Sequence, residues 1–249
     1  MRTVVLACLL ASIALFNIAC TATSPSESAT LASNLDAHAR SYGIVNEPFM
    51  EFVFKQAWLE THEAIFLPAL ARVYAQGDGL IVLAILRDRS IKNTAHGFNQ
   101  KTWTTGDVFE IFIEVSPVLY YEFHVTPENE NLLLRWDPNH FQQVRRGEAQ
   151  FESALIESPD FIQSVATINA ERNYWTIYAF IPYHRLDPDV VPENLNWRIA
   201  LARYDTTVGK PVPILSATPD LTEENFHDRV KWHPLFFGAE GISKSIAED

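Results

Sequence analysis

Carboxylates and histidines that could take part in chemistry are scattered along the chain. Glu110 and Glu114 lie in the run VFEIFIEV, His124 lies in YYEFHV, and His227 lies near the C-terminus in NFHD. Glycoside hydrolysis usually needs two carboxylates about 5 to 10 Å apart. On a strand, Glu110 and Glu114 would share a face but stand roughly 13 Å apart. This pair therefore does not indicate a glycoside hydrolase.

Other catalytic signatures are also missing from the sequence. Glu110, His124 and His227 could suggest a metal site, but no His-x-His or His-x-x-x-His spacing places two ligands on one element. The chain contains no G-x-S-x-G elbow and no glycine-rich phosphate loop. The sequence therefore favours a binding function over an enzyme.

Strands must position these residues. From residue 48 onward, short runs rich in β-branched and aromatic residues alternate with turn residues, which predicts an all-β antiparallel sandwich, of the jelly-roll or immunoglobulin-like kind. The turn QGDG supplies a hairpin signal between the first two strands. We expect strands over Leu70–Ala75, Leu80–Arg87, Val108–Val115, Tyr120–Thr126, Asn131–Trp136, Ser164–Ala170, Tyr174–Pro182, Trp197–Tyr204 and Val212–Ala217.

Side-chain alternation assigns the faces of the two central strands. Successive strand residues point to opposite faces, so Glu110 and Glu114 should face water or a ligand. If the strands around Pro117 pair as a hairpin, Glu110 and His124 share a polar face. The residues expected to face the core are Phe109, Ile111, Ile113, Val115, Tyr121, Phe123 and Val125.

One stretch resembles a known family. After ALARVYAQGDGLIVLAILRD, a loop leads into TWTTGDVFEIFIE, with the ordered landmarks Trp103, Asp107, Glu110, Phe112 and Glu114. This resembles a family 9 carbohydrate-binding module, part of the DOMON-like group of β-sandwiches. Later segments follow in family order, and the resemblance covers roughly residues 57–238. It implies one β-sandwich domain over residues 46–240, followed by a C-terminal tail at 241–249.

The resemblance also implies a sugar-binding site. In sugar-binding members two tryptophans sandwich a terminal sugar ring, and polar side chains bind its hydroxyls. Trp103 matches the first tryptophan, Glu110 a hydroxyl-binding carboxylate, and His124 a basic residue. Phe226, or else Trp232, takes the place of the second tryptophan. The expected ligand-binding residues are Trp103, Glu110, His124, Phe226, His227 and Arg203, with Trp58, Trp136, Trp175 and Trp197 expected in the core.

Several alternatives remain open at this stage. The smaller ring at Phe226 leaves open a sandwich that has lost sugar binding and serves as a structural or protein-interaction domain. Some DOMON-like relatives bind haem, but only Met50 would supply a thioether ligand in the mature chain. No other cofactor is expected, although family members often carry structural calcium, for which the segment Pro127–Asn131 offers oxygen ligands.

The N-terminus predicts export. Arg2 precedes an apolar run from Val4 to Phe16, too short to span a bilayer, so we expect residues 1–19 to be a signal peptide. Asn17-Ile18-Ala19-Cys20 resembles a bacterial lipobox, which implies lipidation of Cys20 and a membrane-anchored lipoprotein.

Ordinary signal cleavage a few residues further on, giving a periplasmic or extracellular protein, is the alternative. The Ser/Thr-rich segment that follows predicts a flexible tether over residues 20–45. The net charge of −12 makes nucleic acid an unsuitable partner.

Overall fold

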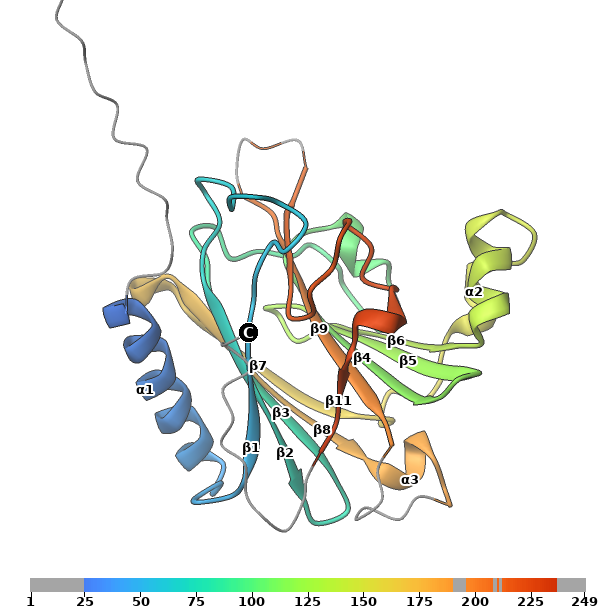
Figure 1. Cartoon of the computed structure of the whole chain (residues 1–249), viewed down its shortest axis with the longest axis horizontal. Helices are drawn as coiled ribbons and strands as arrows, with labels where there is room; N and C mark the ends of the chain where they lie inside the picture. Colours follow the sequence, from blue (N-terminus) through green and yellow to red (C-terminus); the bar gives the residue numbers. More distant parts are fainter. Residues whose placement is uncertain (1–24, 190–195, 208–209, 211, 237–249) are drawn as a thin grey trace, which may run out of the picture.

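The chain forms a sandwich of two antiparallel sheets. The computed structural model describes residues 25–189, 196–207, 210 and 212–236 (Figure 1). The first sheet has the order β1-β2-β3-β8-β7, with bounds Phe49–Val53, Ala69–Gln76, Gly79–Arg87, Tyr174–Pro182 and Gln163–Asn169. The second has the order β10-β9-β4-β5-β6, with bounds Ile214–Ala217, Arg198–Asp205, Val108–Ser116, Leu119–Val125 and Asn131–Trp136, and β11 (His233–Pro234) also pairs with β9.

The predicted all-β sandwich is confirmed, and all nine predicted strands are present. Two further strands, β1 and β11, were not predicted from the sequence. β1 is the short run FMEFV, and β11 has two residues, so neither is long enough to establish an alternating pattern.

The main core lies between the two sheets. Phe109, Ile111 and Ile113 are fully buried there, as their alternation along β4 predicted, and they pack with Val82, Ile177 and other apolar residues of the first sheet. Deep burial of both inner faces is the main source of stability for such a sandwich. The register of the sheets, and with it the outer face of each strand, is therefore fixed by this core.

The outer face of the second sheet is covered rather than exposed to water. A second apolar cluster there includes Phe112, Leu134, Ala202 and Trp232. Short elements in the loops and in the C-terminal segment cover it: η1 (Thr102–Thr104), α2 (Pro138–Arg145), η2 (Phe151–Ala154) and η5 (Arg229–Lys231). The other short elements are η3 (Ala170–Arg172) and α3 (Tyr183–Leu186).

The expectation of a flexible tether over residues 20–45 is wrong for its described part. Residues Pro25–Ser41 form helix α1, which packs on the outer face of the first sheet (Figure 1). Leu31, Leu35 and Ala39 recur every fourth residue, so they form one buried stripe against that sheet. The composition, rich in Ser, Thr and Ala, concealed this stripe. Among the described residues, no helix is long and apolar enough to cross a membrane.

Candidate functional site

A pocket of about 340 Å³ opens on the outer face of the second sheet. Strands β4, β5, β6, β9 and β10 supply its floor, while η1, α2, η2 and the segment around Phe226 supply its walls. The lining residues are Trp103, Glu110, Glu122, Trp136, Phe141, Val144, Arg145, Phe151, Tyr204, Leu215, Glu224, Asn225, Phe226 and His227. Four of the six ligand-binding residues expected from the sequence are therefore among the lining residues of one pocket.

Trp103 forms one wall. Its ring makes edge-to-face contacts with His124 and Phe151, with 5.6 Å between ring centroids in each case. The loop that carries it is fixed by Gly106, which has φ +153° and where a Cβ atom would lie 2.2 Å from the Lys92 carbonyl oxygen. Only glycine fits this close approach of two backbones. The indole is half-buried and lines the pocket rather than the main core.

Phe226 lies on the other side of the floor. Its ring packs edge-to-face on Tyr204 of β9, at 5.8 Å between centroids, whereas Trp103 packs over His124 of β5. Strand β4 runs between β9 and β5 and carries Glu110. The two aromatic side chains therefore flank the Glu110 carboxyl group, although Phe226 is largely buried and presents only part of its ring.

Three buried ionisable side chains meet at the floor, and we call Glu110, Glu122 and His124 the floor cluster. Glu110 and Glu122 line the pocket, whereas His124 lies beside them and is not a lining residue. Glu110 and His124 are direct cross-strand partners, as the hairpin around Pro117 predicted. His124 Nε2 lies 2.7 Å from Glu122 Oε1 and 3.2 Å from Glu110 Oε1. The other oxygen of Glu122 accepts a hydrogen bond from Trp136 Nε1 at 2.7 Å, and Thr102 Oγ1 lies 2.8 Å from His124 Nδ1.

The two carboxyl groups of the floor cluster have opposite pKa shifts. Burial raises the pKa of Glu110 to about 8; His124 opposes this increase, and Glu122 adds a smaller one. Burial would also raise the pKa of Glu122, but His227 and the hydrogen bonds from His124 and Trp136 outweigh it and lower that pKa. Burial lowers the pKa of His124, and its two carboxyl neighbours more than reverse this effect. These shifts favour the neutral acid form of Glu110 beside an ionised Glu122, and they favour the protonated form of His124.

His227 borders the floor cluster. Its ring stacks on Phe141, with 3.9 Å between centroids, and its Nδ1 lies 3.1 Å from the hydroxyl of Tyr120. Its Nε2 lies 3.8 Å from Glu122 Oε2. Burial lowers the pKa of His227 to about 4, so the imidazole is neutral at pH 7.

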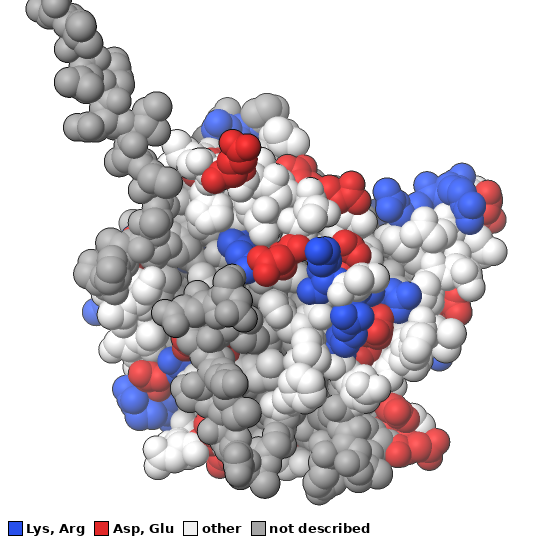
Figure 2. All heavy atoms as spheres, in the orientation of Figure 1, with Lys and Arg blue, Asp and Glu red and all other residues white. Residues whose placement is uncertain are grey.

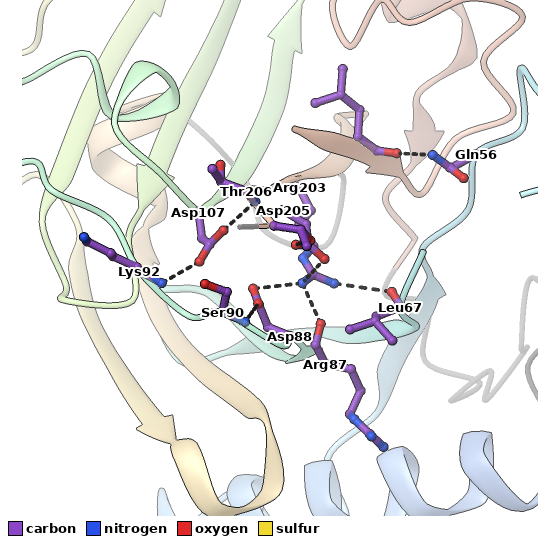
Figure 3. Close-up of polar contacts among 12 residues, drawn as sticks. Gln56, Leu67, Arg87, Asp88, Ser90, Lys92, Asp107, Arg203, Asp205 and Thr206 are labelled. Atoms are coloured by element: carbon purple, nitrogen blue, oxygen red, sulfur yellow. Dashed lines mark hydrogen bonds and ion pairs between the residues drawn. The ribbon is translucent and has the colours of Figure 1, made fainter. Parts of the chain in front are cut away.

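Arg203 does not line the pocket, in contrast to its expected ligand-binding role. It pairs in register with Phe109, so its side chain points to the inner face of the sheet, whereas Ala202 lies beside Glu110. Its Nη2 lies 2.8 Å from Asp205 Oδ2 and 3.1 Å from Asp88 Oδ2 (Figure 3). Because strand residues alternate between faces, a change of rotamer cannot move the Arg203 side chain from the inner face to the outer face.

A group of three acidic side chains also lies on the inner face, and among the described residues it offers the most carboxylate oxygens to a metal ion. Asp88, Asp107 and Asp205 offer carboxylate oxygens within 4.8 Å of one another, but the Arg203 guanidinium lies among them (Figure 3). Asp107 instead accepts hydrogen bonds from the backbone N–H groups of Lys92 and Thr206, both at 2.6 Å. These residues fit a calcium ion poorly, because a positive charge already occupies their centre.

In the segment Pro127–Asn131, which was expected to offer calcium ligands, three side chains use their oxygens in hydrogen bonds within the protein. The Glu128 carboxylate accepts from the Asn93 backbone N–H, and the Asn129 and Asn131 oxygens accept from Ser164 Oγ. Structural calcium therefore stays a prediction, and these residues do not form a favourable site for it. Met50, the one thioether considered for haem ligation, packs against the main core.

Some lining residues were not expected from the sequence. Glu122 lies two residues before His124, so the same alternation places it on the same face and could have identified it. Tyr204, Phe141 and Phe151 come from segments with no motif. Of the four tryptophans expected in the core, Trp175 and Trp197 are buried in it, Trp136 is buried but also borders the pocket, and Trp58 is half-buried.

The surface charge is mixed. On the face in Figure 2, the described Lys and Arg side chains are interspersed with Asp and Glu. Among its described residues, that face therefore carries no large surface of a single charge.

Comparisons with known proteins find similarity at the level of structure. No protein-family model matches the chain, and no curated protein matches it. Among solved structures, a candidate carbohydrate-binding protein from Bacteroides uniformis ATCC 8492 is 13% identical, with a TM-score of 0.55 over 81% of this chain and 90% of that chain. This similarity supports the sandwich fold.

Two further similar structures are of a family 9 carbohydrate-binding module from Caldicellulosiruptor kristjanssonii. The complex with cellotriose is 10% identical, with a TM-score of 0.44 over 80% of this chain and 82% of that chain. The complex with glucose is 10% identical, with a TM-score of 0.46 over 80% and 87%. Both TM-scores are below 0.5, so these structures are too distant to add to the assignment of the fold.

Proposed function

We propose that this chain is a non-catalytic carbohydrate-binding protein that recognises the ends of glycans. The observation that carries the proposal is the convergence of Trp103 and Phe226 on either side of Glu110, over the floor of one pocket. A pyranose ring has apolar C–H faces that stack on aromatic rings and a rim of hydroxyls that need hydrogen-bond partners. This pocket supplies both kinds of contact.

The size of the pocket supports recognition of a chain end. Ligand pockets usually have volumes of about 300 to 1,000 Å³, and this pocket, at about 340 Å³, lies at the lower limit. It suits one or two sugar rings. The neutral Glu110 carboxyl can both donate and accept a hydrogen bond, so it can bind a hydroxyl without introducing a buried charge.

Isothermal titration with xylo-, cello- and manno-oligosaccharides tests the proposal. We expect heat of binding with at least one series and a loss of at least tenfold in affinity for Trp103→Ala, since stacking of one ring contributes about 1 kcal/mol or more beyond the buried area. The matched control is Tyr42→Ala, because Tyr42 stacks on Tyr178 of the first sheet, on the other side of the sandwich. No heat with any glycan would contradict the proposal and favour a sandwich without sugar binding.

A glycoside hydrolase is the second candidate, because Glu110 and Glu122 have carboxylate oxygens within 4.8 Å of each other and their pKa values are shifted in opposite directions. However, the two residues are neighbours on the floor rather than on two sides of the pocket. The Glu122 carboxylate is already bound by His124 and Trp136, which makes it a poor nucleophile. Hydrolysis of chromogenic glycosides that is abolished by Glu122→Gln would favour this candidate over the first.

The proposal includes export and a lipid anchor at Cys20. Support comes from the signal segment and lipobox-like run in the sequence, and Cys20 itself lies outside the described residues. A surface-held protein with a small sugar pocket would capture glycan ends for uptake or for partner enzymes.

A further inference from the structure

The floor cluster holds two buried carboxyl groups close together without a lysine or arginine. The side chains of Glu110 and Glu122 are 3% and 8% exposed, and their ion-pair partners among the described residues are the histidines His124 and His227. Two adjacent buried carboxyl groups are costly unless a positive charge or a proton accompanies them.

We propose that the floor cluster, together with His227, binds a divalent transition-metal ion of the Zn²⁺ class. The inference rests on the geometry of these four side chains and does not depend on the proposed sugar binding. It assigns the floor of the pocket a second ligand, an inorganic cation, in addition to any glycan.

The distances among the potential ligand atoms are close to those around a four-coordinate metal. Ligands about 2.0–2.2 Å from a tetrahedral zinc ion lie about 3.3–3.6 Å from one another. His124 Nε2 lies 3.2 Å from Glu110 Oε1, and His227 Nε2 lies 3.8 Å from Glu122 Oε2. The 2.7 Å contact between His124 and Glu122 would have to lengthen by several tenths of an ångström. The ligand atoms of Glu110, Glu122 and His124 already lie within 4.8 Å of one another, so small side-chain movements suffice for these three. His227 lies outside that group and must move closer to complete the site.

Both imidazole rings are oriented as metal ligands are. A ligating histidine usually has its second ring nitrogen hydrogen-bonded, which fixes the orientation of the ring. His124 Nδ1 contacts the hydroxyl of Thr102 at 2.8 Å, and His227 Nδ1 contacts the hydroxyl of Tyr120 at 3.1 Å. In each ring Nε2 faces Glu122, although the two histidines are 103 residues apart in the sequence. Trp136 likewise fixes the Glu122 carboxylate.

The aspartate group on the inner face provides a comparison within the same protein. Asp88 and Asp205 there are neutralised by a guanidinium group, and Asp107 accepts two backbone N–H groups. In the floor cluster no lysine or arginine plays this part among the described residues. Protons on Glu110 and His124 compensate the charge instead, and a metal ion would displace them. The floor cluster also differs in donor type, because two imidazole nitrogens with carboxylate oxygens suit zinc, cobalt and related ions, whereas calcium prefers oxygen alone.

Metal titration of the untagged chain over residues 21–249 tests the inference, because it retains every described residue. After treatment with a chelator, we expect one Zn²⁺ per chain by elemental analysis and one Co²⁺ with the visible absorption bands of a four-coordinate site, in the absence of any sugar. Glu110→Gln and His227→Gln should each weaken Co²⁺ binding by at least tenfold. Gln is close in shape to the neutral Glu110, so that variant should keep the fold, which circular dichroism would verify.

The matched control is His96→Gln, because His96 is exposed and its hydrogen bonds with Gln100 use the His96 backbone N–H and carbonyl groups. That variant should bind Co²⁺ as the unmodified chain does. Absence of stoichiometric binding by the unmodified chain, or equal binding by folded Glu110→Gln and His227→Gln variants, would overturn the inference. Because the titration contains no sugar, its failure would leave the carbohydrate proposal intact, and loss of sugar binding would leave this result intact.

Discussion

Glu110 and Arg203 lie on neighbouring strands, yet their side chains have different tasks. Glu110 points outward into the pocket, whereas Arg203 points inward and compensates the charges of Asp88 and Asp205. Both were expected to bind a ligand because both match landmarks of a sugar-binding family. The parity of each residue along its strand separates a residue that lines the pocket from a residue that pairs charges inside the fold.

Replacement of Arg203 should reduce stability and leave the pocket unchanged. In Arg203→Met the two aspartates lose their buried partner, which should lower the free energy of unfolding by about 3–5 kcal/mol. Urea denaturation would measure this loss, and titration of the folded fraction with the bound oligosaccharide should give an unchanged Kd.

Arg198→Met is the control on the same strand. Arg198 donates a hydrogen bond to the Val230 carbonyl oxygen and is half-buried, so we expect a cost of about 1 kcal/mol. Weaker sugar binding by Arg203→Met at unchanged stability would contradict this assignment and restore its predicted role.

At the scale of elements, helix α1 completes the first sheet. Leu31, Leu35 and Ala39 cover Tyr74, Ile81 and other apolar side chains that would otherwise face water. Arg72, buried beneath the helix, forms ion pairs with Asp36 of α1 and with Glu51 of β1. The helix is therefore part of the folded domain, and any tether must be confined to residues that precede it.

Leu35→Ala tests whether α1 contributes to stability. Leu35 is fully buried, so its truncation should lower the free energy of unfolding by about 2–5 kcal/mol. Ser33→Ala, on the exposed side of the same helix, should change it by no more than about 0.5 kcal/mol. Equal urea midpoints for the two variants would show that the helix is not docked in solution.

At the scale of the whole molecule, the two outer faces of the sandwich are divided between two roles. α1 covers the first sheet, and the pocket lies on the second sheet (Figure 1). The proposed anchor at Cys20 precedes α1 by a few residues. An anchored chain would thus be attached through the element that packs on the sheet opposite the pocket.

Cys20→Ser should release the protein from the membrane. Lipidation needs the thiol, so the variant should move from the membrane fraction to the soluble fraction on cell fractionation, and mass spectrometry should find no lipid on its mature N-terminus. Cys8→Ser, inside the predicted signal, should leave the protein in the membrane fraction. A membrane-bound Cys20→Ser protein would argue against the anchor.

Alternation along the chain predicted the sandwich and the faces of its two central strands, and it made the Glu110–His124 pairing conditional on a hairpin around Pro117. Alternation in Val108–Val115 and Tyr120–Thr126 identified the inward residues and the Glu110–His124 pair, because each inner face must be apolar along its whole length. The aromatic residues at 103 and 226 were found through ordered landmarks rather than through any local pattern.

Which of these residues meet depends on how the chain folds in three dimensions. The floor cluster joins two strands, while Phe141, Phe151 and His227 approach it from loops and helices distant in sequence. Contacts of this kind depend on how loops fold over a sheet, and no periodicity along the chain encodes that. The same holds for α1. Its apolar stripe stabilises the helix only because the first sheet provides an apolar face on which the stripe packs.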